Sequence, residues 1–380
     1  MIDHCSPPRF QKAVRIVISS ILRTFAVPAL FVLSISTASA QTIEQMAGQM
    51  IIVGFAGDDA DDKSVVAVRR QIADGVLGGL IYLKPNIASL SRVSAMNEAF
   101  LAASPDLPPF LAIDQEGGQV ERLTSAVGFD EEPPAKQVAA NDSLDEAESL
   151  YLGMATSIAD LGFTVNFGPV VDLSVNPRNR VIARAGRAYG ADPETVSDYA
   201  AAFVRAHHAA GMLTALKHFP GHGSSKADSH RGFVDITKTW SKTELEPYAT
   251  LIDEGLADMV MVGHLFNADY ADEDSQQPAS LSSRWIEGVL RGDLGFTGVV
   301  ISDDLEMAAI RQHYSLRESV VAAVRAGVDV LLFSNTDRYT PGLAAQVRTI
   351  LVKEAEADPA FRTRIEESYA RIASLKKQIG

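Results

Sequence analysis

The chain has 380 residues, of which 47% are hydrophobic and 22% charged, with a formal net charge of −14 at pH 7. This length is enough for one large α/β barrel or two medium domains. The acidic balance, with no basic cluster to neutralise phosphates, argues against a nucleic-acid partner and is compatible with an enzyme that acts on small molecules.

The beginning of the chain has the three parts of a secretory signal peptide. A basic segment contains Arg9, Lys12 and Arg15, an apolar core follows over 25–35, and small residues at 38–40 form a cleavage site. The apolar run is too short for a comfortable membrane span, so an uncleaved membrane anchor is the less favoured alternative.

The single cysteine, Cys5, falls inside this leader. The mature chain would therefore have no disulfide, catalytic thiol or thiolate metal site, which suits an oxidising compartment. We expect a signal peptide over 1–40, a mature domain over 41–380, and export of the protein to the periplasm. We expect no stable membrane insertion once the leader has been removed.

From residue 41 onward, apolar runs typical of buried strands alternate with stretches typical of helices. The predicted strands are 50–55, 79–83, 110–114, 163–173, 212–216, 259–264, 298–303 and 328–333. The predicted helices are 144–160, 193–210, 241–254, 284–291, 316–326 and 344–356, with a final helix over 358–377 that packs on the rest. Near-continuous apolar strands are typical of parallel sheets covered on both faces.

Eight such strands alternating with helices predict an α/β fold, a single-domain (β/α)8 barrel of the TIM type. The alternative is an open doubly wound sheet. It is less favoured because no glycine-rich dinucleotide fingerprint follows the first strand, and because polar residues occur at many strand ends rather than at one switch point.

Polar residues gather where these strands end. The densest group is the segment 217–230 (KHFPGHGSSKADSH), which holds three histidines, two lysines and an aspartate. The carboxyl ends of barrel strands converge at one face, so we expect the following residues to lie close together: Asp114, Arg122, Asp172, Lys217, His218, Asp228, His230, His264 and Asp303. An aspartate after a strand can instead close a turn or cap a helix; this interpretation is favoured for Asp172 and is equally good for Asp304.

Glycoside hydrolysis is the first reaction class that fits these residues. It needs an acid that protonates the leaving oxygen and a carboxylate that attacks the anomeric carbon. One acid of the Asp303–Asp304 pair would attack, and His230, kept basic by Asp228, would donate the proton. The residues that would bind sugar hydroxyls are Asp114, Arg122, Lys217 and His218.

Metal-assisted hydrolysis is the second class. Its zinc ligands would be His218, His222, Asp228, His230 and His264. Their spacing is irregular and the chain has no helical His-Glu-x-x-His pair, so this class is disfavoured.

Four motifs resemble the family 3 glycoside hydrolases of the β-N-acetylhexosaminidase (NagZ) type. They are Lys-His-Phe-Pro-Gly-His-Gly at 217–223, Asp-Ser-His at 228–230, Ile-Asp-Gln-Glu-Gly-Gly at 113–118 and Ser-Asp-Asp-Leu-Glu-Met at 302–307. The resemblance covers the whole mature chain. Gln119 departs from it, since many relatives have arginine there, and the leader departs from the best-known relatives of this size, which are cytoplasmic.

The resemblance implies a (β/α)8 barrel that needs no metal and no cofactor. It implies that Asp303, rather than Asp304, is the nucleophile, and that His230 is the acid/base with Asp228 as its partner on a mobile loop. The residues that it implies for binding the N-acetylglucosamine ring are Asp114, Arg122, Arg187, Lys217 and His218.

We therefore expect a monomeric retaining exo-β-N-acetylglucosaminidase acting on cell-wall muropeptides or chitooligosaccharides. One alternative is a β-glucosidase or β-xylosidase of the same family, but those enzymes draw their acid/base from a second domain, for which this chain has no room. The other alternative is a non-catalytic sugar-binding barrel. It is disfavoured because a candidate nucleophile and a candidate proton donor are both present.

Overall fold

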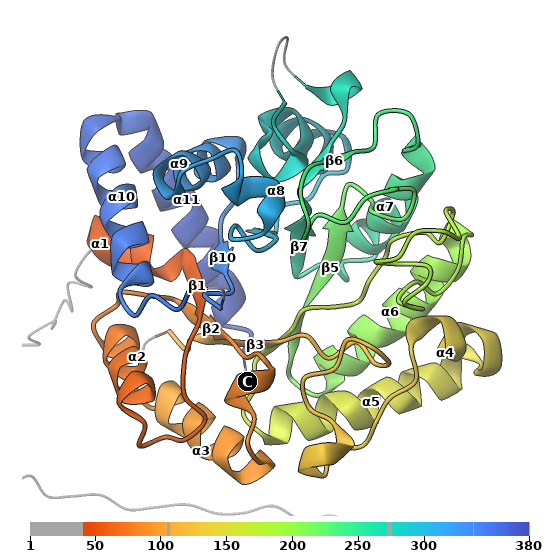
Figure 1. Cartoon of the computed structure of the whole chain (residues 1–380), viewed down its shortest axis with the longest axis horizontal. Helices are drawn as coiled ribbons and strands as arrows, with labels where there is room; N and C mark the ends of the chain where they lie inside the picture. The colour runs from red at the N-terminus through yellow and green to blue at the C-terminus, as the bar shows by residue number, and fades with distance from the viewer. Residues whose placement is uncertain (1–40, 105–106, 272–275, 337, 380) are drawn as a thin grey trace, which may run out of the picture. The chain divides into compact units, whose positions relative to one another are not determined.

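A barrel of eight parallel strands with helices around it forms the part of the chain that carries the predicted site (Figure 1). The computed structural model describes residues 41–104, 107–271, 276–336 and 338–379. The predicted signal peptide over 1–40 lies outside the described residues. Residues 41–380 form one compact unit, and their architecture confirms the predicted (β/α)8 barrel.

The strands of the barrel follow one another around the sheet almost in chain order, β10-β1-β2-β3-β4-β5-β7-β9. Their bounds are β1 (Ile51–Gly54), β2 (Gly79–Ile81), β3 (Phe110–Ile113), β4 (Val165–Asn166), β5 (Leu213–Phe219), β7 (Met259–Val262), β9 (Val299–Ser302) and β10 (Leu331–Phe333). The barrel closes between β9 and β10, where Ile301 and Val330 form a parallel bridge. The Ser302 N–H also donates to the Val330 carbonyl at 3.0 Å.

The helices lie outside the strands (Figure 1). Their bounds are α1 (Ile43–Gln49), α2 (Lys63–Ala73), α3 (Leu90–Leu101), α4 (Ala135–Asn141), α5 (Leu144–Asp160), α6 (Pro193–Ala209), α7 (Glu246–Asp253), α8 (Ala308–Arg311), α9 (Leu316–Ala326), α10 (Leu343–Ala357) and α11 (Pro359–Lys376). Ser143 and Ser315 begin α5 and α9 with complete capping boxes, which satisfy backbone donors at those helix starts. Among the described residues, no helix has the length and apolar character needed to cross a bilayer.

The predicted helices from residue 144 onward are present, with two differences in type. The segment predicted as one helix over 241–254 is a 3-10 helix, Lys242–Leu245, followed by α7. The segment 284–291 belongs to a π-helix, Arg284–Asp293. Helices α1 to α4 and the short α8 were missed; α2, for example, buries only Val65, Val68 and Ile72, so its apolar stripe is thin.

The predicted strand over 163–173 is wrong in extent. Only Val165–Asn166 (β4) joins the barrel, because Gly168 turns back to the Asn166 carbonyl and Pro169 has no N–H for a ladder. Val170 then makes a single bridge to Lys217. The buried segment after Pro169 therefore lies beside the end of β5 rather than in a longer β4.

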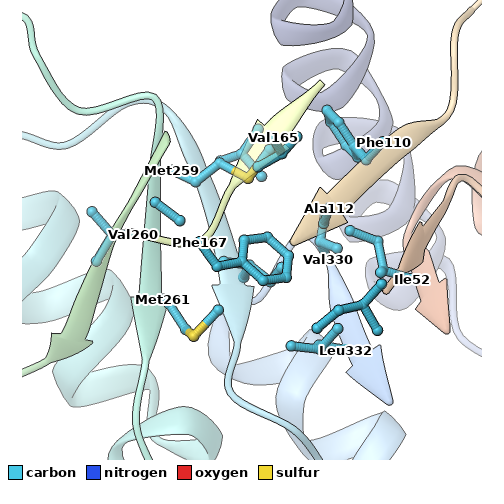
Figure 2. Close-up of a cluster of buried hydrophobic side chains, with 14 of the residues drawn as sticks. Ile52, Phe110, Ala112, Val165, Phe167, Met259, Val260, Met261, Val330 and Leu332 are labelled. Carbon is cyan, nitrogen blue, oxygen red and sulfur yellow. The ribbon is translucent and has the colours of Figure 1, made fainter. Parts of the chain in front are cut away.

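The interior of the barrel is filled by alternate residues of neighbouring strands (Figure 2). Ile52, Ala112, Phe167, Met261 and Leu332 are all almost completely buried there. Side chains two residues apart on a strand share a face, so each strand contributes to this core at every second position. Phe167, Met261 and Leu332 also line the pocket described below, so the top of the core is the floor of that pocket.

The final helix, α11, is fixed to the barrel by polar side chains as well as apolar ones. Arg364 and Ser368 each donate to Oδ1 of the buried Asp329 at 2.8 Å. Near its end, Lys376 Nζ donates to Gln49 Oε1 at 2.7 Å and to the Gly78 carbonyl at 2.6 Å. The predicted packing of this helix on the barrel is confirmed.

Candidate active site

Most of the predicted site residues line one pocket of about 420 Å³ at the carboxyl ends of the strands. The predicted residues that line it are Asp114, Arg122, Arg187, Lys217, His218, His230 and Asp303. Asp228 does not line the pocket but contacts His230. Gln119 is exposed and outside the pocket lining, whereas Glu116 and Val120 on either side of it are part of that lining.

Asp114 accepts hydrogen bonds from two positively charged side chains of the pocket, Lys217 and Arg122. It follows β3 directly, and its Oδ1 accepts from Lys217 Nζ at 2.7 Å while its Oδ2 accepts from Arg122 Nη2 at 3.0 Å. Burial alone would raise the pKa of Asp114, but Lys217 and Arg122 outweigh it and hold that pKa well below its ordinary value. Asp114 is therefore an ionised acceptor that fixes both cations.

Glu116 is a member of this network that the sequence argument did not assign. It forms a two-point ion pair with Arg187, Nε to Oε2 and Nη2 to Oε1, both at 2.8 Å, and it also contacts Lys217 Nζ at 2.6 Å. Burial opposes its ionisation, yet Arg187 and Lys217 lower the pKa of Glu116 to about 2. Every cation of the network is thus paired with a carboxylate before any ligand arrives.

Lys217 and His218 are adjacent on β5, and adjacent strand residues normally point to opposite faces. Both line the pocket, at a point where the Lys217–His218 peptide bond is cis and the register of β5 against β7 shifts between Lys217 and Phe219. Such an irregularity re-aims side chains at the end of a strand.

Asp172 was interpreted from the sequence as a turn-closing residue, and this was wrong. Its side chain is fully buried, and its Oδ2 accepts from His218 Nδ1 at 2.7 Å. Its Oδ1 accepts from the His222 N–H at 2.6 Å and from the His218 N–H at 3.3 Å. Burial would raise the pKa of Asp172, but His218 and His222 bring it below its ordinary value, so the carboxylate is ionised.

His230 reaches the pocket from a loop. Asp228 Oδ1 accepts from both His230 Nδ1, at 2.8 Å, and the His230 N–H, at 3.0 Å, so Nε2 is the ring nitrogen left for the pocket. The His230 side chain is 66% exposed. The loop ends at β6 (Val234–Asp235), which pairs with β8 (Leu265–Phe266), so its downstream end is anchored to a small sheet.

The two acids after β9 have different surroundings. Asp304 Oδ1 accepts from the Ser334 N–H at 2.9 Å and the Glu306 N–H at 3.0 Å, whereas Asp303 Oδ1 accepts from the Asp304 N–H at 2.8 Å. Burial raises the pKa of Asp304. Burial would do the same for Asp303, but His264 and His218 outweigh it and lower the pKa of Asp303. Both acids line the pocket; Asp303 is an ionised carboxylate there, whereas the side chain of Asp304 secures the turn.

The residues proposed as zinc ligands do not converge. His264 contacts Ser280 Oγ at 2.7 Å and donates from Nε2 to the Asp304 carbonyl at 2.9 Å, behind the acids rather than in the pocket. His222 is buried, and its Nδ1 lies 2.6 Å from Ser225 Oγ. Within the described ranges, no group of three or more His, Cys, Asp or Glu side chains is arranged to hold a metal ion.

Glu244 is a second buried carboxyl group that the sequence argument missed. It lies behind the segment 217–230, where its Oε2 accepts from the Ser224 N–H at 3.3 Å and its Oε1 has no hydrogen-bond partner among the described residues. Gly221, at φ +120°, makes room for it, since a Cβ there would lie 2.6 Å from Glu244 Cβ. Burial, with a smaller contribution from Asp172, raises the pKa of Glu244 to about 8.

This raised pKa gives folding stability a defined pH dependence. Between about pH 4.5 and 8 the folded chain holds a proton on Glu244 that the unfolded chain has lost, so the free energy of unfolding falls as pH rises. The glutamine in Glu244→Gln cannot ionise, so this variant lacks the contribution. Between pH 5.5 and 7.5 we expect the free energy of unfolding to fall more steeply with pH in the wild type than in the variant, by about 1.4 kcal/mol per pH unit.

Urea denaturation at several pH values measures this slope. Glu246→Gln, two residues away at an exposed position, is the matched control and should keep the wild-type slope. Parallel stability profiles for wild type and Glu244→Gln would contradict the assignment of a neutral Glu244.

Comparison with known proteins places this geometry in a family. The family model "Glycosyl hydrolase family 3 N terminal domain" matches residues 42–375. A beta-hexosaminidase of Xylella fastidiosa (strain 9a5c) is 37% identical over 305 residues, which cover 78% of this chain and 86% of that protein. A beta-hexosaminidase of Pseudomonas aeruginosa (strain LESB58) is 39% identical over 272 residues, which cover 70% and 78%.

Two solved structures have the same fold. The beta-N-acetylhexosaminidase from Beutenbergia cavernae DSM 12333 superposes with a TM-score of 0.80 at 29% identity, covering 89% of this chain and 99% of that one. The family 3 beta-N-acetylglucosaminidase from Paenibacillus sp. str. FPU-7 gives a TM-score of 0.80 at 32% identity over 89% of this chain. This chain spans 63% of the length of the Paenibacillus enzyme.

Proposed function

The chain belongs to glycosyl hydrolase family 3, and we infer that it is a β-N-acetylhexosaminidase that removes terminal N-acetylglucosamine with retention of configuration. The observation that carries this inference is the presence, in a single pocket, of the ionised carboxylate of Asp303 and the Asp228-bound imidazole of His230. A retaining glycosidase needs a nucleophile and an acid/base, and these two side chains supply one of each.

In the first step, Asp303 attacks the anomeric carbon and the glycosidic bond breaks. His230 protonates the departing oxygen, so a glycosyl-enzyme ester and a free alcohol result. In the second step, His230 takes a proton from water, the water oxygen attacks the same carbon, and the ester bond to Asp303 breaks. Asp303 is better suited to this role than Asp304, whose Oδ1 already accepts two backbone N–H groups.

The charge network supports binding of a neutral sugar. Lys217, Arg122 and Arg187 are each paired with Asp114 or Glu116, so the pocket offers oriented donors without an unpaired cation. Sugar hydroxyls can both donate and accept hydrogen bonds, and they suit such a surface of fixed donors and acceptors. We assign the binding of the terminal sugar ring to Asp114, Arg122, Arg187, Lys217 and His218.

The alternatives predict other behaviour. A β-glucosidase or β-xylosidase would not need to recognise an N-acetyl group, and the compared relatives are named beta-hexosaminidases. A non-catalytic sugar-binding barrel would have no use for the Asp228–His230 pair beside an ionised Asp303.

We also propose that residues 1–40 direct export and that the enzyme acts in the periplasm. The basic segment, apolar core and small-residue site of the leader support this proposal. An enzyme exported in this way would meet muropeptides or chitooligosaccharides as substrates. The chemistry in the pocket needs no stable protein partner.

Fractionation of a Gram-negative host that expresses the full chain tests activity and location together. Periplasmic and cytoplasmic fractions are assayed with p-nitrophenyl β-N-acetylglucosaminide and with the β-glucoside. We expect activity in the periplasmic fraction, with kcat/KM higher by about 10²-fold or more for the N-acetyl sugar, because a site built to hydrogen-bond one group rejects the analogue that lacks it.

Each outcome bears on a different part of the proposal. Activity confined to the cytoplasm would contradict export while supporting the enzyme assignment. A preference for the glucoside would contradict the sugar assignment. Binding of the sugar without hydrolysis would contradict the enzyme assignment.

A further inference from the structure

The loop that carries His230 also carries an exposed aromatic ring. Phe233 lies three residues after His230 and is 37% exposed. Among the large apolar residues that are exposed in the described part of the chain, it is the only aromatic one. Its ring centroid lies 5.2 Å from that of Phe266 and 6.1 Å from that of His313, so residues of two other segments hold the ring in place.

Phe233 lines a second pocket, which has a volume of about 180 Å³. The other residues that line it are Gln276, Pro278, Ala309, His313 and Tyr314. This lining combines aromatic rings with an amide, an imidazole and a phenol hydroxyl. Such a mixture suits a sugar, because the C–H groups of a pyranose ring pack on an aromatic face while its hydroxyl and amide groups form hydrogen bonds.

The second pocket adjoins the active-site pocket, because two segments of the chain contribute to both. On the first segment, His230 lines the active-site pocket and Phe233 lines the second pocket. On the other segment, Met307 lines the active-site pocket and Ala309 lines the second pocket. The Ala309 N–H donates to the Ser229 carbonyl at 3.3 Å, so the two segments are joined next to His230.

The second pocket lies on the side where the leaving group departs. His230 protonates the departing oxygen, so the aglycone begins at His230 and extends away from the terminal sugar ring. Three residues of chain span at most about 11 Å, a distance that one or two linked sugar units can cover. An aglycone that is itself a sugar can therefore reach Phe233.

We propose that the second pocket is a subsite for a sugar unit of the aglycone, whose pyranose ring packs on Phe233. The inference rests on the proposed function and names the part of the substrate that this function left open. Ring contact removes the exposed face of Phe233 from water, which favours binding of a glycan over binding of a simple glycoside. Chitooligosaccharides and muropeptides both present a pyranose ring at this place.

The test compares substrates that all need a proton on the leaving oxygen. The full chain is assayed at initial rate with methyl β-N-acetylglucosaminide, whose aglycone has no ring, and with N,N′-diacetylchitobiose and N,N′,N″-triacetylchitotriose. A second arm uses the disaccharide of N-acetylglucosamine and N-acetylmuramic acid, with and without its peptide. We expect kcat/KM to be higher by about 10-fold or more for a glycan that reaches the pocket than for the methyl glycoside.

Variants then show whether Phe233 causes this preference. We expect Phe233→Ala to lose about 10-fold in kcat/KM on the preferred glycan and to stay within about 2-fold of the wild type on the methyl glycoside. Phe233→Tyr keeps the ring and should retain the preference. His313→Ala alters the pocket without touching the loop of His230 and should weaken the same preference. Lys226→Ala, exposed on that loop and outside both pocket linings, is the matched control.

A disturbed catalytic loop gives a different pattern from a lost subsite. A displaced His230 lowers kcat/KM on the methyl glycoside as well, because that leaving oxygen also needs a proton. Equal losses on the methyl glycoside and the glycans in Phe233→Ala, or no loss on either, would overturn the proposal.

The two arms identify the glycan. A Phe233-dependent preference for the chitooligosaccharides, for the muramic acid disaccharide or for both supports the subsite and shows which glycan occupies it. A preference that appears only when the peptide is attached would overturn it, since the pocket would then bind peptide. A wild type that hydrolyses none of these substrates would contradict the proposed function itself, whereas hydrolysis without any Phe233-dependent preference would overturn the subsite alone.

Discussion

Replacement of Asp303 by asparagine is expected to lower kcat on β-N-acetylglucosaminides by about 10⁴-fold or more, as loss of a catalytic nucleophile does in other enzymes. The amide keeps the shape of the carboxylate but cannot form the glycosyl ester. Burial alone would raise the pKa of Asp303, but His264 and His218, together with the Asp304 N–H, lower it, so the wild-type carboxylate is ionised across neutral pH. Single-turnover and steady-state kinetics on the same substrate measure the loss.

Asp304→Asn is the matched control for this prediction, because it alters the neighbouring carboxyl of the same turn. Its amide oxygen can still accept the Ser334 and Glu306 N–H groups, so we expect a loss well below that of Asp303→Asn. Unchanged circular dichroism and thermal unfolding would show that both variants fold. If Asp304→Asn proved the more damaging of the two, the nucleophile would be misassigned.

His230→Ala should have an effect that depends on the leaving group. General acid catalysis contributes about 10² to 10⁴-fold where the departing oxygen needs a proton. We expect a loss of that size in kcat/KM for N,N′-diacetylchitobiose, and a loss of only about 10-fold for the p-nitrophenyl glycoside, whose leaving group departs as a stable anion. Because kcat/KM reports on steps up to the first bond cleavage, it isolates the role of His230 as an acid.

Arg231→Ala serves as the control for the His230 variant. Arg231 is next in the chain, is 80% exposed and lies 3.7 Å from the Asp228 carboxylate, so its loss disturbs the same loop without removing the imidazole. Exposed substitutions of this kind usually change free energies by less than about 0.5 kcal/mol. Equal losses on both substrates in His230→Ala would contradict the acid role.

The features that the sequence predicted well are those with local signals. Eight apolar runs predicted the barrel, and polar residues after those runs, such as Asp114, Lys217 and Asp303, predicted the face that carries the pocket. The face was predicted correctly because a parallel barrel brings the carboxyl ends of all its strands to one side. A residue that directly follows a strand in the sequence therefore lies near that side.

The roles that were missed depend on partners far apart in the chain: Asp172 was expected near the other strand ends but was interpreted as closing a turn, and Glu116 was not assigned. Asp172 contacts a histidine 46 residues away, and Glu116 pairs with an arginine 71 residues away. A usable signal existed for Asp172: it lies in the apolar sequence Val170-Val171-Asp172-Leu173, and a buried carboxylate requires a partner. Glu244 gave no such signal, since it lies at the end of the polar sequence Ser241-Lys242-Thr243-Glu244.

The extent of β4 was overestimated for a related reason. The run 163–173 is apolar throughout, and apolar character indicates burial rather than strand pairing. Gly168 and Pro169 interrupt the ladder, and the chain beyond them is buried against the end of β5 instead.

The most direct test of the account is to trap the covalent intermediate on the wild-type enzyme. A 5-fluoro-N-acetyl-β-glucosaminyl fluoride forms the glycosyl-enzyme quickly and releases it slowly, so peptide mass spectrometry can locate the sugar. We expect one fluorinated sugar esterified to Asp303 and no labelling of Asp303→Asn. A sugar attached to Asp304 or to any other residue, or steady turnover of substrate without a trapped ester, would contradict it.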